Sequence, residues 1–131
     1  MIKAFIENFI KNKYKERILY ELNSNKSEKR EKAFTKLLEY EECFKNDFKK
    51  IDLSHLNVDE ILNIINNSYY NKSCYSLRYD CELKLDKAII DQINRCILDI
   101  LIIDEKNIVY IGEVYHNKDG GTASSKFIAY K

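Results

Sequence analysis

The last third of the chain alternates three apolar stretches with two short polar ones. The apolar stretches are 96–103 (CILDILII), 108–115 (IVYIGEVY) and 124–130 (SSKFIAY). The connecting segments, DEKN and HNKDGG, have the composition of tight turns, so the pattern predicts three strands in a β-meander. The first stretch is apolar at every position except Asp99, which is typical of a central strand covered on both faces.

The first half of the chain has helical rather than strand periodicity. Apolar residues recur every three or four positions over 2–22 and again over 28–45, which predicts two helices. The polar linker between them is short, so the two helices should form an antiparallel hairpin. A third helix is predicted over 58–67, because Asn57 and Glu60 stand at the spacing of a capping box.

The segments that remain are shorter. Residues 48–53 are predicted to be a short extended segment or a linker, residues 73–79 to form a strand and residues 85–94 to form a short helix. A crossover from this strand through the helix to the strand at 96–103 would make a βαβ unit. The predicted fold class is therefore α+β. An N-terminal helical hairpin and a third helix pack on a roughly four-stranded, mainly antiparallel sheet with a C-terminal β-meander.

Composition places the chain among ordinary globular proteins. Of 131 residues, 45% are hydrophobic and 33% are charged, and the length predicts one domain spanning 1–131. The net charge of +1 argues against strong attraction to nucleic acid or to an anionic membrane. The charge is uneven, since residues 1–50 carry a net +4 and residues 51–131 a net −3. An RNA-binding module that uses the basic helical half therefore remains a third alternative.

The cysteines and histidines do not follow a metal-binding pattern. The four cysteines are Cys43, Cys74, Cys81 and Cys96. Neither their spacing nor that of the two histidines matches a zinc site, so we expect no metal, no cofactor and reduced thiols. The chain has no secretory signal pattern and no apolar run long enough to span a membrane. We therefore expect a cytoplasmic protein.

Asp99 is the first candidate for chemistry, because it is the one charge in the central strand. If the hairpin loop is Glu105-Lys106, Asp99 lies opposite Gly112, which leaves room beside the carboxylate with Tyr110 nearby. The same register places Glu113 on the face opposite Asp99, so these two side chains should not form a carboxylate pair.

Two interpretations of this charge remain open. A small hydrolase or nucleic-acid-processing enzyme would use Asp99 with Glu113 and His116, although no motif places a nucleophile beside them. The simpler interpretation is a structural carboxylate, satisfied by a helix N-terminus or by a basic side chain such as Arg78 or Arg95.

Tyrosines suggest a binding surface. The chain has ten of them, and Tyr69 and Tyr70 lie close in sequence to Arg78 in NNSYYNKSCYSLRY. Tyrosine and arginine are enriched at protein interfaces, so we take these three residues as binding candidates, with Tyr110 as a fourth. The simpler interpretation is that the tyrosines fill the edge of the core with their hydroxyl groups in water.

The absence of a complete catalytic motif, metal set or nucleotide loop in the sequence favours a binding role over an enzymatic one. The leading hypothesis is a small cytoplasmic protein-binding protein, in the concrete form of an inhibitor, immunity or antitoxin-like protein. Its partner would then be another protein, such as a toxin or effector, rather than a nucleic acid or a membrane.

Overall fold

The structure is a computed structural model that describes residues 2–39, 41–69, 72–95, 97–115 and 123–130. The helices are α1 (Ile2–Phe9), α2 (Asn12–Leu22), α3 (Ser27–Glu39), the single-turn η1 (Glu41–Cys43), α4 (Val58–Ser68) and α5 (Leu85–Asn94). The strands are β1 (Lys50–Asp52), β2 (Ser73–Ser76), β3 (Cys81–Lys84), β4 (Asp99–Ile102), β5 (Ile108–Tyr115) and β6 (Ala123–Tyr130). These strands form one antiparallel sheet in the order β1-β6-β5-β4-β2-β3.

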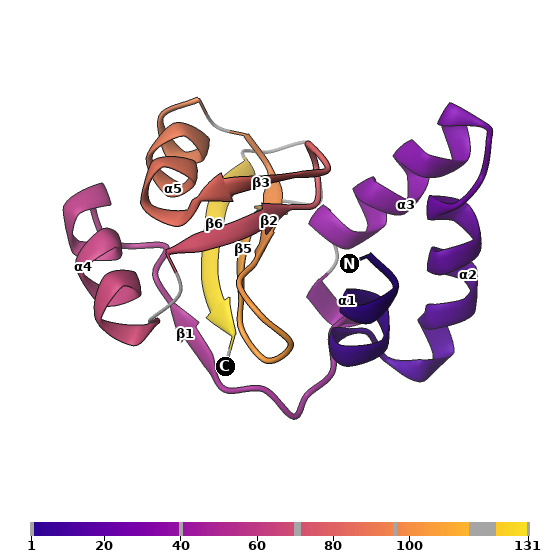
Figure 1. The fold of residues 1–131 in the computed structure, drawn as a ribbon, viewed down its shortest axis with the longest axis horizontal. Coiled ribbons are helices and arrows are strands. Elements are labelled where there is room, and N and C mark those ends of the chain that lie inside the picture. Colours follow the sequence, from indigo (N-terminus) through magenta and orange to yellow (C-terminus); the bar gives the residue numbers. More distant parts are fainter. Residues whose placement is uncertain (1, 40, 70–71, 96, 116–122, 131) are drawn as a thin grey trace.

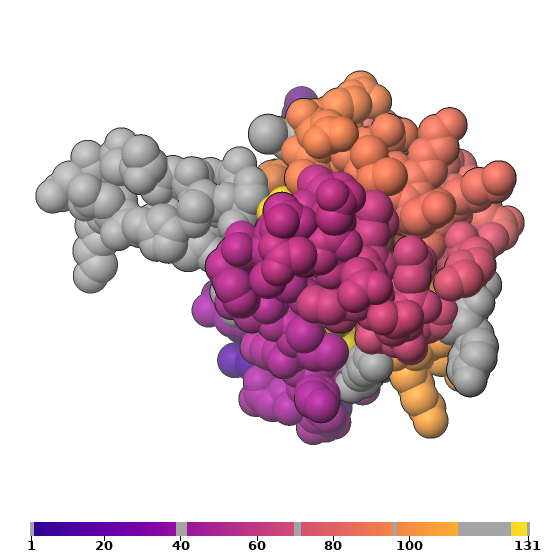
Figure 2. Space-filling view, turned by 90° about the vertical axis from the view of Figure 1, so that its left-hand side faces the viewer, coloured from indigo at the N-terminus to yellow at the C-terminus, as the bar shows by residue number. Residues whose placement is uncertain are grey.

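The sheet lies between two layers of helices (Figure 1). Helices α1, α2 and α3 cover one face and share a core with Ile100, Ile102 and Tyr110 of the sheet. Helices α4 and α5 cover the other face and pack against Leu101 and Val109. Figure 2 shows the side of the molecule that carries α4, where residues from the middle third of the chain lie in front. The helical hairpin and the later helices therefore lie on opposite faces.

The class predicted from the pattern is confirmed, with more strands than expected. All four residues of β4 are buried, as a central strand between two helical layers requires. Strands β4, β5 and β6 form the C-terminal meander. The sheet has six strands rather than about four, because the extended segment β1 pairs with β6 and because β3 was not foreseen.

The predicted βαβ crossover is wrong. After β2 the chain reverses direction through the turn at 77–80 and continues into β3, which pairs with β2. β2 also pairs antiparallel with β4, so β2 and β4 are not the parallel strands of a βαβ unit. The turn places Asp80 at a φ of 52°, a left-handed conformation that aspartate adopts more readily than most residues. β3 was missed because Cys81–Lys84 is short and its side chains are mostly exposed, so it lacks the apolar signal of a strand.

The helix expected over 2–22 is interrupted. Ile10 forms an isolated bridge with Phe44, and the Lys11 N–H donates to the carbonyl of Cys43 at 2.8 Å. In return, the Lys45 N–H donates to the carbonyl of Phe9 at 2.8 Å. These contacts replace helical hydrogen bonds, so the chain changes direction between α1 and α2. Side-chain periodicity could not reveal a break that is made by a distant backbone segment.

The predicted register of the first hairpin is off by one residue. Asp99 pairs with Ile111 rather than Gly112, and Ile102 rather than Ile103 pairs with Ile108. The loop is longer than two residues because the Asp104 carboxylate accepts from the N–H of Lys106 and the amide of Asn107. A shift of one residue exchanges the faces of a strand, so the predicted placement of Asp99 and Glu113 on opposite faces of the sheet is wrong.

Candidate binding groove beside the Asp99 network

Asp99 is the centre of a buried hydrogen-bond network. Its side chain is 0% exposed. Oδ2 accepts from the hydroxyl of Ser76 at 2.5 Å and from Nε2 of Gln92 at 2.7 Å. Oδ1 accepts from the backbone N–H groups of Arg78 at 2.9 Å and Ile100 at 2.7 Å. Four donors thus surround one carboxylate, which is what a polar group in a core requires.

The network joins elements that are distant in sequence. Ser76 lies at the end of β2, Arg78 in the turn that follows, and Gln92 on α5. The Ser76 hydroxyl oxygen also accepts from the N–H of Tyr79 at 3.1 Å. Asp99 therefore holds the β2–β3 turn and helix α5 in fixed positions relative to each other.

Burial raises the pKa values of two ionisable groups in this region, Asp99 and Cys74. Desolvation raises the pKa of the Asp99 carboxyl, and the four hydrogen bonds only partly oppose this effect. Burial, with a smaller effect from the Asp99 charge, raises the pKa of the nearby Cys74 thiol to about 12. Cys74 is therefore an unreactive core thiol at neutral pH.

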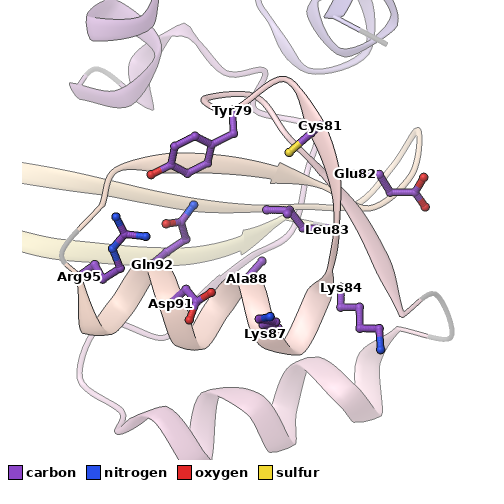
Figure 3. A pocket seen from close by; sticks show the side chains of 10 residues that line it. All are labelled: Tyr79, Cys81, Glu82, Leu83, Lys84, Lys87, Ala88, Asp91, Gln92 and Arg95. Carbon is purple, nitrogen blue, oxygen red and sulfur yellow. The ribbon is translucent and has the colours of Figure 1, made fainter.

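A groove lies beside this network, between α5 and the β2–β3 hairpin (Figure 3). It has a volume of about 520 Å³. Its lining residues are Tyr79, Cys81, Glu82, Leu83, Lys84, Lys87, Ala88, Asp91, Gln92 and Arg95. Gln92 lines the groove and also donates to Asp99, so the network supports one wall of the groove. The Asp99 carboxylate itself does not line it.

The groove combines an apolar floor with a charged rim. Leu83 and Ala88 contribute apolar surface, and Ala88 is buried against the core. Lys84, Lys87 and Arg95 are exposed and positively charged, whereas Glu82 and Asp91 are exposed and negatively charged. Tyr79 is 47% exposed and lies over the side of the groove where Arg95 ends α5 (Figure 3).

Two of the predicted binding residues are core residues. Tyr69 is 6% exposed and packs in the cluster formed by α4, α5 and the sheet. Tyr110 is also buried, and its hydroxyl donates to the carbonyl of Leu38 at 2.6 Å. The ring of Tyr110 fills the space left by Gly112, where an added Cβ would collide with it. The room beside Gly112 therefore belongs to Tyr110 and does not form a pocket for Asp99.

The other sequence candidates are placed as follows. Arg78 is exposed, and its guanidinium donates to the carbonyl of Leu98 at 3.3 Å. It satisfies Asp99 through its backbone N–H rather than through its charge, and Arg95 lines the groove instead of reaching Asp99. Glu113 lies in β5, and the structure does not describe its side chain. Tyr70 and His116 lie outside the described residues.

Ser76 and Gln92 are not identified from the sequence as partners of Asp99. For Gln92, the sequence does contain a signal. Gln92 follows Leu85, Ala88 and Ile89 at helical spacing, so it is a polar residue at a core position of a helix. Such a residue indicates a buried partner. Ser76 gave no comparable signal, because a serine in a short strand is unremarkable.

The described part of the chain contains no group of three or more His, Cys, Asp or Glu side chains placed to hold a metal ion. None of the helices in that part is long and apolar enough to cross a membrane. No protein-family model, curated protein or solved structure matches this chain.

Proposed function

We propose that this chain is a small cytoplasmic protein-binding protein of the inhibitor, immunity or antitoxin kind, and that its partner docks in the groove between α5 and the β2–β3 hairpin. The observation that carries the proposal is Tyr79, which is 47% exposed at the side of a hollow of about 520 Å³. An exposed aromatic ring beside an apolar floor, ringed by charges, is typical of an interface anchor.

The Asp99 network supports this role because it makes the groove rigid before binding. The backbone N–H groups of Arg78 and Tyr79 are both held by the network, and Gln92 is held on the facing helix. A preformed groove loses less conformational entropy on binding than a mobile one. The network thus provides a reason for a buried charge that involves no catalysis.

The sheet edge beside the groove offers backbone groups to a partner. β3 is the edge strand next to β2, and the Leu85 N–H donates to the carbonyl of Lys72 at 2.8 Å. Because hydrogen-bonded pairs alternate along an antiparallel ladder, the backbone of Glu82 faces away from β2. An extended segment of a partner can pair with such an edge while its side chains enter the groove.

The same geometry disfavours a hydrolase that uses Asp99. Both carboxylate oxygens already accept two hydrogen bonds each, and the side chain is fully buried. A general base needs to reach a substrate proton directly or through one water molecule. The free, exposed thiol of Cys81 agrees with the reducing compartment that is part of this proposal.

The test begins with the partner. A protein captured by the wild-type chain from cells of its source organism is identified by mass spectrometry, produced recombinantly and titrated against the purified chain by calorimetry. Tyr79→Ala and Lys87→Glu should each weaken binding at least about tenfold, because both residues line the groove. Lys106→Glu makes the same charge change in the β4–β5 turn and should stay within about twofold of wild type.

Thiol labelling gives an independent readout. Cys43 and Cys74 are buried and Cys81 is exposed, so in a Cys96→Ser background the rate of alkylation reports on Cys81. Binding of the partner should slow this rate, since Cys81 lines the groove. Full affinity in folded Tyr79→Ala and Lys87→Glu variants, with no protection of Cys81, would exclude the groove as the docking site.

A further inference from the structure

Glu21 has an unusual environment on the helical hairpin. It is 4% exposed, although it lies on α2 in the outer layer. Its Oε1 accepts from Nε of Arg17 at 2.9 Å. No hydrogen-bond donor among the described residues reaches Oε2, which is itself buried. Leaving one oxygen of a desolvated carboxylate without a donor is costly.

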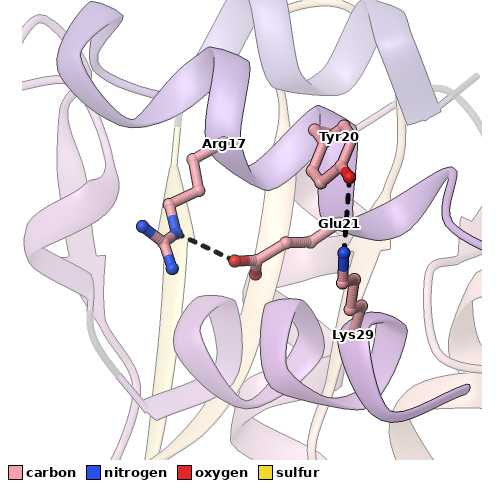
Figure 4. Close-up of polar contacts among 4 residues, drawn as sticks. All are labelled: Arg17, Tyr20, Glu21 and Lys29. Atoms are coloured by element: carbon pink, nitrogen blue, oxygen red, sulfur yellow. Dashed lines mark hydrogen bonds and ion pairs between the residues drawn. The ribbon is translucent and has the colours of Figure 1, made fainter. Parts of the chain in front are cut away.

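This carboxylate lines a cleft between α2 and α3. The cleft has a volume of about 560 Å³ and is lined by Glu16, Arg17, Tyr20, Glu21, Lys29 and Lys32. Figure 4 shows Glu21 extending from α2 into the space above α3, with Arg17 on one side and Tyr20 on the other. Tyr20 is 65% exposed, and a second hollow lies along it towards Asn23.

The aromatic face beside the carboxylate already carries a positive charge. Lys29 of α3 places its ammonium 4.9 Å from the centroid of the Tyr20 ring and donates to the Tyr20 hydroxyl at 3.3 Å. The ring therefore offers a cation-binding surface that the chain itself occupies with a flexible, half-buried lysine. Glu21, whose buried Oε2 has no donor among the described residues, lines the same cleft.

We propose that this cleft is a receptor site for an arginine side chain of a partner protein. The guanidinium would donate to Oε2 of Glu21 and stack on the ring of Tyr20 in place of Lys29. Arginine fits better than lysine because its planar group offers several N–H donors while its face contacts an aromatic ring. The lining contains three cations, Arg17, Lys29 and Lys32, and two carboxylates, Glu16 and Glu21, so the arginine would bind by displacing Lys29 from the ring.

The site is separate from the groove of the proposed function. The cleft belongs to the layer formed by α1, α2 and α3, and the groove lies beside α5 on the other side of the sheet. The two proposals can therefore fail independently.

The probe is a short glycine peptide with one central arginine and blocked ends, titrated into the ¹⁵N-labelled chain and followed by NMR. The matched control is the same peptide with citrulline, which keeps the shape and loses the charge. The arginine peptide should bind at least about tenfold more tightly than the citrulline peptide. Shifts should concentrate on the amides of Tyr20, Glu21 and Lys29.

Three variants give the site a specific signature. Glu21→Gln keeps the size of the side chain and should weaken the arginine peptide about tenfold or more, because a donor replaces the acceptor at Oε2. Tyr20→Ala should weaken it by several fold. Lys29→Met should strengthen it, because the competing internal cation is removed. General electrostatics alone would move the affinity of a cationic peptide in the same directions in Glu21→Gln and Lys29→Met. The loss in Tyr20→Ala, which changes no charge, is therefore the result that identifies the site.

Several results would overturn the proposal. Equal binding of the arginine and citrulline peptides would do so, and so would unchanged affinity in Glu21→Gln. Shifts that fall outside α2 and α3 would also overturn it. Each variant is checked by circular dichroism, and Tyr20→Ala changes an exposed residue, so the test survives if Glu21→Gln does not fold.

Discussion

At the residue scale, Asp99 shows how the chain accommodates a carboxylate inside its core. Its four donors come from a serine, a glutamine and two backbone amides, and none of them is a cation. The carboxylate is therefore solvated by dipoles that the fold has fixed in place. Such a network stabilises the fold only while every member has its partner.

Replacement of Asp99 separates the geometry of this network from its charge. Asp99→Ala should lower the free energy of unfolding by about 2–5 kcal/mol, because it leaves buried donors of Ser76 and Gln92 without an acceptor. Asp99→Asn should cost less, about 2 kcal/mol or below, because the amide of Gln92 can turn and the hydroxyl of Ser76 can accept. Urea unfolding measures both values, and equal losses would contradict this account.

The charge of Asp99 should appear in the pH dependence of stability. Burial raises its pKa in the folded state above the ordinary value of 3.8, so the folded chain holds this proton more tightly than the unfolded chain. Asp99 therefore favours folding most when protonated. Its contribution should decline as the pH rises from about 3.8 through the folded pKa and stay constant above it.

The measurement is the difference in free energy of unfolding between wild type and Asp99→Asn, followed from acid to neutral pH. Subtraction removes the titration of the remaining carboxylates. A flat difference would show that the hydrogen bonds balance the effect of burial on the pKa, and a difference that grows in favour of wild type with rising pH would show that they outweigh it.

At the element scale, helix boundaries set by local sequence could be predicted, whereas a boundary set by tertiary contacts could not. Helix α4 begins where the sequence indicated, since Asn57 accepts from the Glu60 N–H at 2.9 Å and the Glu60 carboxylate accepts from the Asn57 N–H at 3.3 Å. The break between α1 and α2 had no local signal, because it depends on the backbone around Phe44.

The cap gives a prediction with an internal control. Asn57→Ala should lower the free energy of unfolding by about 1 kcal/mol, because it removes the acceptor for a helix N-terminal N–H. Asn66→Ala makes the same chemical change at an exposed position inside α4 and should be neutral or slightly stabilising. Thermal or urea unfolding tests the pair, and an equal effect of both changes would exclude the capping box as the cause.

At the scale of the whole molecule, one sheet serves two cores. Ile100 and Leu101 are neighbours in β4 and are both fully buried, yet Ile100 packs against the α1–α3 layer and Leu101 against the α4–α5 layer. The stability of each helical layer therefore depends on the same central strands.

Truncation on either face of β4 should destabilise the whole chain. Ile100→Ala and Leu101→Ala should each cost about 2–5 kcal/mol. Far-ultraviolet circular dichroism and tyrosine fluorescence should report one common transition in each variant. A loss below about 1 kcal/mol, or separate transitions for the two probes, would show that the two layers are not coupled through the sheet.

The sequence by itself determined the features that depend on neighbours along the chain. Helical periodicity identified α4 and α5 with their boundaries almost correct, and the apolar run around Asp99 identified a strand covered on both faces. Capping, periodicity and turn composition act over a few residues, so one sequence contains all of their physics. The α+β class follows from these local signals.

Only the tertiary structure decided what depends on residues distant in sequence. It set the register of β4 and β5 through the Asp104 turn, paired the weak strand β3 with β2, and satisfied Asp99 with Ser76 and Gln92. It also buried Tyr69 in the core. These outcomes depend on packing and on which buried donors meet which acceptors, and a pattern read along one chain records neither.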